Sequence, residues 1–274
     1  MLKIFIKDIK ALVCFFLFAT LSVFWIFITI TISDKEHSFY VYFTNSYWTM
    51  AFFGGLFGLL VSQQWGGFKS HMGKSIMFFS LGLWSQVFGQ FTYAYYIYIL
   101  GVEVPYPSLG DIGFFGTIPL YILGSYYLAK VSGVALTLKS LKGKLLLLLI
   151  PLPVLLLSYT VFLSGYEYDW SIPLTTFLDF GYPLGQSIYI AIALLIYFLS
   201  KGILGGIMKG HILFLLFALV VQYLSDFVFL YMASRGTWYP GNINDFMYLT
   251  SYFLMSVSVL RIGHVALKVK GGNF

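Results

Sequence analysis

Charged side chains are scarce in this sequence of 274 residues, where Asp, Glu, Lys and Arg together make up 9%. A soluble domain carries roughly 25%. The mean hydropathy of +0.87 points the same way, because a water-soluble core of this size could not bury so much apolar surface. The low charge excludes an ordinary soluble domain and indicates that lipid surrounds most of the chain.

Cysteine and histidine are also rare, which excludes several kinds of site. The single cysteine, Cys14, lies in a hydrophobic run and has no partner for an internal disulfide. The four histidines fall in loops or at segment ends without metal-ligand spacing, and no catalytic triad converges. We expect no enzymatic activity, no catalytic residue, no metal and no cofactor. The net charge of +6 is scattered between hydrophobic segments, so a nucleic acid partner is not expected either.

Hydrophobic segments long enough to cross a bilayer recur along the chain. A helix needs about 20 mostly apolar residues to span a hydrocarbon core of about 30 Å. The sequence predicts an all-α integral membrane protein with about eight transmembrane helices. The expected segments are residues 11–32, 47–63, 75–100, 111–131, 145–164, 174–199, 211–233 and 245–262.

The basic residues support this division independently. All but two of the 16 lysines and arginines fall on one side: before the first segment, at or after the end of the eighth, or at the segment ends and in the loops that follow the second, fourth and sixth. Lys35 and Arg235 are the exceptions. Because cytoplasmic loops are enriched in Lys and Arg, we expect an N-in/C-in topology, and the bacterial resemblance described below implies the cytoplasmic (inner) membrane of a prokaryote.

Polar residues recur in the same order in the two halves of the chain. Gln86 and Gln90 of the third segment parallel Gln222 and Asp226 of the seventh. A Tyr-Pro pair precedes an aspartate at the start of both the fourth and the eighth segments. We expect two parallel four-helix repeats, residues 1–135 and residues 136–274, the second with a short cytoplasmic tail. Chance matching of apolar segments is the alternative.

Seven polar residues are expected to face the bundle interior near its extracytoplasmic surface. Their spacing by three or four residues puts each group on one helix face. A charged side chain in hydrocarbon costs at least about 2.5–3.5 kcal/mol, so they should point away from lipid. Two interpretations are equally favoured: a pocket for a small cationic or hydroxyl-rich ligand, or hydrogen-bonded helix packing. The candidates are Gln86, Gln90, Asp179, Tyr182, Gln186, Gln222 and Asp226.

Asp111 and Asp245 each follow a turn rich in Pro and Gly and open a segment. An aspartate there is expected to act as the helix N-cap, where the helix dipole favours negative charge. The rim of the proposed pocket is the alternative role.

Two Gly-x-x-x-Gly pairs allow helices to approach closely. They are Gly54 with Gly58 and Gly181 with Gly185. Contact within the bundle is favoured over contact between copies of the chain in a homo-oligomer.

Several short motifs occur in an order that resembles multi-helix bacterial membrane sensor modules, the input modules fused to diguanylate cyclases. The resemblance covers roughly residues 45–262. It implies an eight-helix sensory module, and since few residues follow the last segment, no output domain is expected on this chain. Gln90 and Gln186 stand where the family pattern carries acids. The matching motifs are PSLGD at 107–111, IPL at 118–120, YPLG at 182–185, LSD at 224–226 and RGTW at 235–238.

These features favour a sensor or receptor-like membrane module as the function. A small ligand of unknown identity would bind the outward-facing pocket, shift the two repeats and move the eighth helix. A separate cytoplasmic signalling partner would detect that movement. The alternative is a small-solute or cation transporter, since repeats and buried acids are also transporter traits. The apolar cytoplasmic halves of the segments favour a pocket open to one side only.

Overall fold

The computed structural model of this chain describes residues 8–167, 169–200 and 206–270. Over these residues the protein is helical and has no β-strand. The first half contains α2 (Ile9–Thr31), α3 (Ser38–Thr44), α4 (Trp48–Gln64), η1 (Gly67–Lys69), α5 (His71–Tyr95), η2 (Tyr96–Leu100) and α6 (Leu109–Val131). The second contains α7 (Val134–Thr137), α8 (Leu141–Leu149), α9 (Pro151–Ser158), η3 (Tyr159–Leu163), α10 (Pro173–Ser200), α11 (Met208–Ala233) and α12 (Ile243–Lys270).

Each hydrophobic segment expected from the sequence is helical. The third continues from α5 into η2, and the fifth is built from α8, α9 and η3. Within the described ranges, six helices are long and apolar enough to cross a membrane. The six are Ile9–Thr31, Leu109–Val131, Leu141–Leu163, Pro173–Ser200, Met208–Ala233 and Ile243–Leu267. This all-helical composition is that of a multi-pass membrane protein.

The helices α4 and α5 are not among these six. The helix α4 has 17 residues, and α5 carries His71, Lys74 and two glutamines among its apolar side chains. Polar side chains lower the mean hydropathy of a helix even when they point into the protein. A hydropathy average cannot tell such a helix from one that stays outside the membrane.

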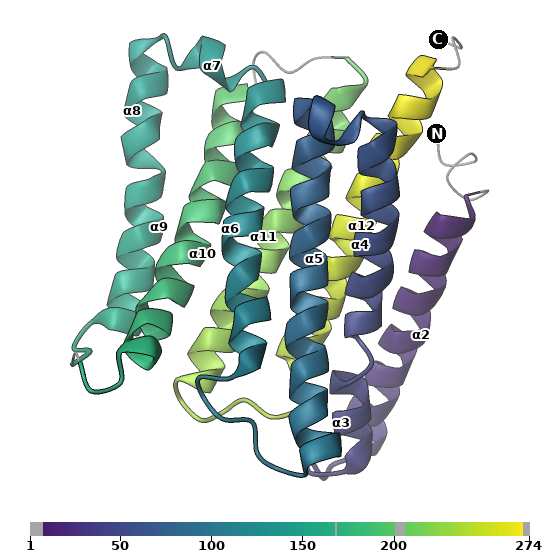
Figure 1. The fold of residues 1–274 in the computed structure, drawn as a ribbon, viewed down its shortest axis with the longest axis vertical. Helices are drawn as coiled ribbons and strands as arrows, with labels where there is room; N and C mark the ends of the chain where they lie inside the picture. Colours follow the sequence, from purple (N-terminus) through teal and green to yellow (C-terminus); the bar gives the residue numbers. More distant parts are fainter. Residues whose placement is uncertain (1–7, 168, 201–205, 271–274) are drawn as a thin grey trace.

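Six helices pack as a closed ring. Around it, α4 contacts α5, α5 contacts α6, α6 contacts α10, α10 contacts α11, α11 contacts α12, and α12 contacts α4. Outside the ring, α2 packs against α12 and α4, and α9 packs against α10. These helices run side by side along the long axis of the molecule, with the start of α2 and the end of α12 toward the same end (Figure 1).

Small residues bring the ring helices close together. A Cβ added at Gly113 of α6 would lie 2.5 Å from the backbone nitrogen of Gly89 on α5. The Ser85 hydroxyl donates a 2.7 Å hydrogen bond across this contact to the carbonyl oxygen of Gly113. Larger residues here would push the two helices apart, because backbone and not a flexible side chain fills the space.

Both Gly-x-x-x-Gly pairs lie at contacts within the chain. A Cβ at Gly54 of α4 would come within 2.0 Å of the Ser256 hydroxyl on α12. A Cβ at Gly181 of α10 would come within 2.6 Å of the Phe115 ring on α6. Each pair therefore lets one helix of one half of the chain approach a helix of the other half.

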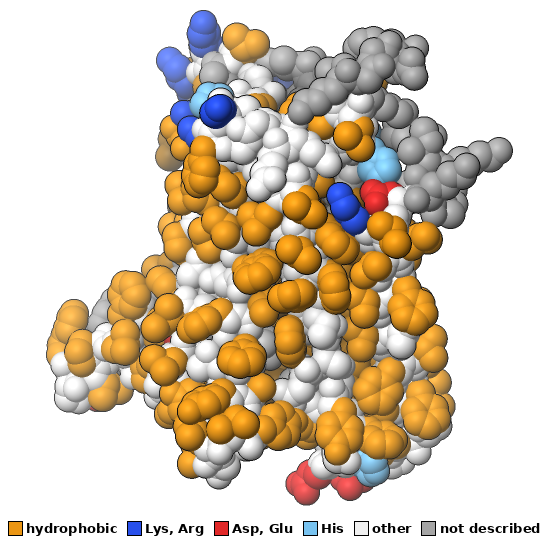
Figure 2. Space-filling view, turned by 45° about the vertical axis from the view of Figure 1, so that its right-hand side comes forward, with side chains coloured by type: hydrophobic (Ala, Val, Ile, Leu, Met, Phe, Trp, Pro, Cys, Tyr) orange, Lys and Arg blue, Asp and Glu red, His pale blue; other side chains and the backbone are white. Residues whose placement is uncertain are grey.

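The outer surface is apolar around its middle and charged at its ends. Hydrophobic side chains cover the central part of the molecule in Figure 2, with lysine and arginine gathered toward the upper end. A group of acidic side chains lies at the lower tip of this view. We call the lysine-rich end, where α2 begins and α12 ends, the basic end, and the opposite end the acidic end. Such a belt between two polar ends matches a protein embedded in a bilayer.

Candidate functional site

A buried carboxylate, Asp226, is the centre of the largest side-chain hydrogen-bond network in the described part of the protein. Gln222 lies one turn earlier on α11, and its Nε2 donates a 2.9 Å hydrogen bond to Asp226 Oδ1. The Tyr189 hydroxyl of α10 donates to Oδ2 at 2.7 Å, and the Tyr248 hydroxyl of α12 donates to Oδ1 at 3.1 Å. Three helices therefore meet at one carboxylate, which is only 5% exposed.

Neutral groups provide all of these donors. No lysine or arginine forms an ion pair with Asp226, and the only ion pair found within residues 8–167, 169–200 and 206–270 joins Asp8 to His264. A buried charge usually needs a cation, a metal or several hydrogen bonds to offset its loss of hydration. At Asp226, three hydrogen bonds from neutral groups are the contacts found among the described residues that offset the loss of hydration.

Ser251 extends this network, and two separate hydrogen bonds lie beside it toward the first half of the chain. Ser251 of α12 donates a 2.7 Å hydrogen bond to Gln222 Oε1. The Tyr252 hydroxyl donates to Gln86 Oε1 on α5 at 3.3 Å. Gln90, one turn further along α5, donates from Nε2 to the Tyr47 hydroxyl at 2.8 Å. Four of the seven candidate residues thus lie in one region.

A stack of tyrosine rings joins these hydrogen bonds. Tyr47 lies parallel to Tyr248 with ring centroids 6.3 Å apart, and Tyr248 stacks on Tyr252 at 5.9 Å. Tyr47 also stacks on Tyr252 at 6.1 Å. Because Tyr248 and Tyr252 are four residues apart, they share one face of α12. Tyr248, which donates to the carboxylate, therefore belongs to a ring stack that joins the two halves of the chain.

Two further tyrosines beside this cluster have unused hydroxyls. Tyr121 of α6 packs edge-on to Tyr189 with centroids 5.6 Å apart, and Tyr223 of α11 packs edge-on to the same ring at 6.3 Å. Both hydroxyl oxygens are buried and have no hydrogen-bond partner among the described residues. An unsatisfied buried hydroxyl costs about 1–3 kcal/mol. Such groups need an explanation, and a bound ligand or water would supply one.

Asp179 does not belong to this network. The Tyr106 hydroxyl donates to its Oδ1 at 2.7 Å, and the Tyr166 hydroxyl donates to its Oδ2 at 2.6 Å. Asp179 lies ten residues before Tyr189 on α10, about 15 Å along the helix axis. It forms a separate clamp that holds two loops at the acidic end.

The two loop tyrosines of this clamp have raised pKa values. Burial raises the pKa of Tyr106, and its hydrogen bond to Asp179 raises it further. The hydrogen bond to Asp179 also raises the pKa of Tyr166. In both cases the neutral phenol is favoured because the phenolate would lose its bond to the carboxylate and face a negative charge.

Asp111 and Tyr182 form a third group between α6 and α10. The Tyr182 hydroxyl donates to Asp111 Oδ1 at 2.7 Å. Asp111 Oδ2 accepts from the Ser108 backbone nitrogen at 2.7 Å, and Ser108 is the N-cap in a capping box. Asp111 is therefore not the N-cap, as expected from the sequence, but the third residue of α6, which begins at Leu109. The N-cap is Ser108, whose hydroxyl accepts a hydrogen bond from the Gly110 backbone nitrogen, and Asp111 completes the capping box.

Asp245 occupies the corresponding place in α12. Asn242 precedes the helix, and its Oδ1 accepts from the backbone nitrogens of Asn244 and Asp245 at 2.7 and 3.3 Å. Asp245 Oδ2 accepts from Thr44 Oγ1 at 2.6 Å and from the Gly241 backbone nitrogen at 2.8 Å. Here too the aspartate follows the capping residue, and it ties α12 to α3 of the first half.

Gln186 is the candidate with the least defined role. It is 7% exposed and lies one turn before Tyr189 on α10. No hydrogen bond from its side chain joins it to the Asp226 network described above. The seven candidates are therefore divided between a network around Asp226, a clamp at Asp179 and a contact at Asp111, with Gln186 beside the first.

Three tyrosines of the candidate site were not identified from the sequence. Tyr189, Tyr248 and Tyr252 hold the network together, and each lies three or four residues from another polar residue of its helix. That spacing could have indicated that these tyrosines share a helix face with the candidate residues. With 22 tyrosines in the chain, however, spacing alone does not separate those facing Asp226 from those facing lipid.

Within the described ranges, no three His, Cys, Asp or Glu side chains are grouped so that they could hold a metal ion. No protein-family model matches the chain, and no curated protein or solved structure matches it. The chemistry of the site must therefore be inferred from the residues themselves.

Proposed function

We propose that this chain is a sensor module of the cytoplasmic membrane of a prokaryote, and that the Asp226 network binds a small cationic ligand. The observation that carries the proposal is a buried carboxylate held by neutral donors, two of them tyrosines. Two further tyrosines, whose buried hydroxyls lack partners, pack against one of these, Tyr189. Aromatic faces attract cations, and a carboxylate supplies the opposite charge. A site with this chemistry would suit an organic ammonium ion.

The proposal includes eight transmembrane helices in two repeats, residues 1–135 and 136–274. The order of contacts around the ring supports it: α4–α5–α6 in the first half corresponds to α10–α11–α12 in the second. The two joining contacts, α12 with α4 and α6 with α10, also correspond, and a Gly-x-x-x-Gly pair lies at each. Asp111 and Asp245 hold the same third position in α6 and α12.

The orientation follows from the charge distribution. With an even number of crossings, the start of α2 and the end of α12 lie on the same side, and the basic end is cytoplasmic by the positive-inside rule. Asp226 lies seven residues before the end of α11, or about 10 Å from the acidic, extracytoplasmic end. The ligand would reach it from outside the cell.

The network offers a route from ligand to cytoplasm. Two of its bonds join α11 to α12, from Tyr248 to Asp226 and from Ser251 to Gln222. A ligand that takes the place of the Tyr248 hydroxyl at Asp226 would favour a different packing of α12. The ligand can change the equilibrium between the two packings of α12 only by the difference in its binding free energy for them. At the basic end of the same helix pair, Arg261 of α12 lies over the Phe214 ring at 4.8 Å, where a signalling partner would detect the change.

A sealed cytoplasmic half favours sensing over transport. Leu215 and Leu219 of α11 are 0% exposed and Leu260 of α12 is 2% exposed. These apolar side chains fill the bundle between the network and the basic end. A transporter would need a polar route through this region.

The test uses purified protein in a neutral detergent, with choline and tetramethylammonium as cationic probes and glycerol as a neutral one. We expect the cations, and not glycerol, to raise the melting temperature of the unmodified protein. Asp226→Asn should abolish the shift, whereas Asp34→Asn at an exposed site should retain it. A shift that survives in Asp226→Asn would refute the site. Uptake of choline into proteoliposomes would favour the transporter instead.

A further inference from the structure

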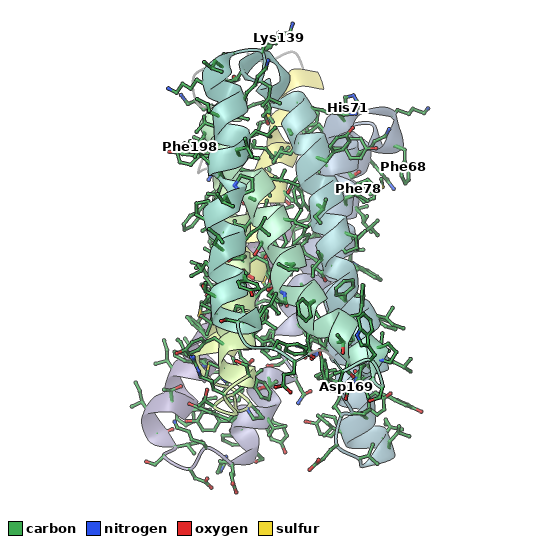
Figure 3. The ribbon with its side chains drawn as sticks, turned by 90° about the vertical axis from the view of Figure 1, so that its left-hand side faces the viewer. Phe68, His71, Phe78, Lys139, Asp169 and Phe198 are labelled. Atoms are coloured by element: carbon green, nitrogen blue, oxygen red, sulfur yellow. The ribbon has the colours of Figure 1, made fainter. Side chains whose placement is uncertain are left out.

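A cluster of basic and aromatic side chains lies at the basic end of the α5–α6 pair, far from the Asp226 network. Lys74 Nζ of α5 lies 5.2 Å from the Tyr127 ring centroid, and Lys130 Nζ of α6 lies 5.6 Å from the same centroid. Lys130 Nζ is also 4.5 Å from the Tyr126 ring, and the His71 ring stacks on Tyr127 at 5.8 Å. Figure 3 labels His71 and Phe78 along this edge of the molecule.

These two lysines come from different helices but share one ring. The geometry is fixed, because α5 and α6 are joined below the cluster by a 2.8 Å hydrogen bond from Ser75 Oγ to the Gly124 carbonyl oxygen. Phe78 also stacks on the Tyr127 ring, with centroids 5.7 Å apart and planes 3° apart. The rings hold the lysine side chains in place but carry no formal charge to neutralise them.

No carboxylate of the surrounding elements balances this charge. The sequence has no Asp or Glu between residues 37 and 102 or between residues 112 and 166. Those ranges contain all of α4, α5, α7 and α8 and the last turns of α6. Asp8, before α2, is bound to His264 at 2.8 Å. Two cations that face the same ring without an anion leave several N–H donors available.

The cluster lies at the depth of lipid headgroups. It occupies the first turn of α5 and the last turn of α6, where helices leave the hydrocarbon and where aromatic and basic residues gather in membrane proteins. Beside it in η1, Phe68 is 69% exposed, as expected for a side chain that inserts among acyl chains. A soluble anion would not account for the exposed Phe68.

We propose that Lys74, Lys130 and the Tyr126–Tyr127 pair form a binding site for the phosphate headgroup of an anionic phospholipid. The two ammonium groups bind the phosphate oxygens, and the tyrosine rings pack against the glycerol and the upper acyl chain. The site holds a lipid between α5 and α6 at the basic end. It depends on the chain being embedded in a membrane and does not depend on the proposed ligand at Asp226.

The test is native mass spectrometry of the detergent-purified protein, titrated with phosphatidylglycerol or with phosphatidylcholine of the same acyl chains. In detergent no anionic membrane surface is present, so only lysines that contact the bound lipid should matter, each by at least about fivefold through its hydrogen bonds to the phosphate. Lys74→Gln/Lys130→Gln should therefore weaken phosphatidylglycerol binding by about twentyfold or more. The matched control, Lys142→Gln/Lys144→Gln, removes the same charge from two exposed residues of α8. It should change the affinity by less than about twofold. Phosphatidylcholine binding should be weak and equal in all three proteins.

Three results would overturn the proposal. Equal losses in the two double variants would mean diffuse attraction to anionic lipid without a site. An unchanged affinity in Lys74→Gln/Lys130→Gln would remove the lysines from lipid binding. Displacement of phosphatidylglycerol by millimolar inorganic phosphate would identify a free anion as the occupant. If the double variant does not fold, the exposed single substitution Lys130→Gln should still weaken binding by about fivefold, and no loss there would equally count against the site.

Discussion

Polar residues that correspond under the proposed repeat form different hydrogen bonds in the two halves of the chain. In the first half, Gln86 and Gln90 lie one turn apart on α5, and each is hydrogen-bonded to a single tyrosine. In the second half, Gln222 and Asp226 lie one turn apart on α11, bond each other and draw in two tyrosines and a serine. Replacing an amide by a carboxylate therefore requires more donors. The comparison indicates that the second half surrounds its buried carboxylate with donors, whereas the first half uses its amides in single contacts.

The largest effect should come from removing the charged member of the pair. Asp226→Ala leaves Gln222, Tyr189 and Tyr248 without their shared acceptor in a buried space. Since each stranded donor costs about 1–3 kcal/mol, we expect a loss of at least about 3 kcal/mol in the free energy of unfolding. Reversible denaturation in mixed micelles would measure it.

The matched variant in the first half is Gln90→Ala, which strands only the Tyr47 hydroxyl. It should cost about 1 kcal/mol. Equal losses in the free energy of unfolding for the two alanine variants would mean that Asp226 and Gln90 contribute equally to stability, despite their different numbers of hydrogen bonds.

The next prediction tests whether a charge is tolerated at Gln90, in the first half of the chain. Gln90→Glu removes the amide that donates to the Tyr47 hydroxyl and places a carboxylate beside it, and Tyr47 is the one side-chain partner of Gln90 found in the described structure. We expect a cost of about 2 kcal/mol, somewhat below the value for a charge at the centre of a bilayer because Gln90 is only partly buried. The loss should shrink as the pH is lowered, because protonation removes the charge. A fully stable Gln90→Glu protein at neutral pH would contradict this expectation.

The sequence predicted the helices well, because hydropathy and lysine placement respond directly to the bilayer. The segments containing polar residues, α5 and α10, were found as readily as the purely apolar α8 and α9. Helix ends were predicted less well. The segment at residues 245–262 omitted the last two turns of α12, where His264 pairs with Asp8, since charged residues at a helix end look like a loop in a hydropathy profile.

The candidate site was predicted only in part. Helical periodicity put Gln222 with Asp226 and Gln86 with Gln90 on shared faces, and the structure joins these pairs through tyrosines. Periodicity also put Asp179 on a face of α10 with Tyr182 and Gln186, but it does not report how far apart residues of different helices are along the bundle axis. That distance separates Asp179 from Asp226. Such information comes from tertiary packing.

A smaller effect is expected at the contact between the halves near α6. Tyr182→Phe removes the hydroxyl that donates to Asp111 but leaves the capping box with Ser108 intact. We expect a loss of about 1.5 kcal/mol, the lower range for a hydrogen bond to a charged acceptor. Ser108→Ala, which removes the N-cap and keeps the tyrosine, should cost about 1 kcal/mol. A much larger loss for Ser108→Ala would show that capping, and not the contact between α6 and α10, is the main role of Asp111.

The smallest effect lies in the clamp at Asp179, which joins loops of the two halves. Tyr106→Phe and Tyr166→Phe each remove one donor to this carboxylate, and each should cost about 0.5–1.5 kcal/mol. Because the pKa of both phenols is raised in the folded protein, their stabilisation is present below pH about 10, the ordinary tyrosine value. It is lost as the pH rises toward their folded-state pKa values. The melting temperature of the unmodified protein should therefore fall more steeply between pH about 9 and 11 than that of the Tyr106→Phe/Tyr166→Phe variant, measured in the same detergent. The membrane-embedded tyrosines are common to both proteins, so parallel curves would mean that the clamp contributes nothing to the folded state and that the two halves are held together by the ring helices alone.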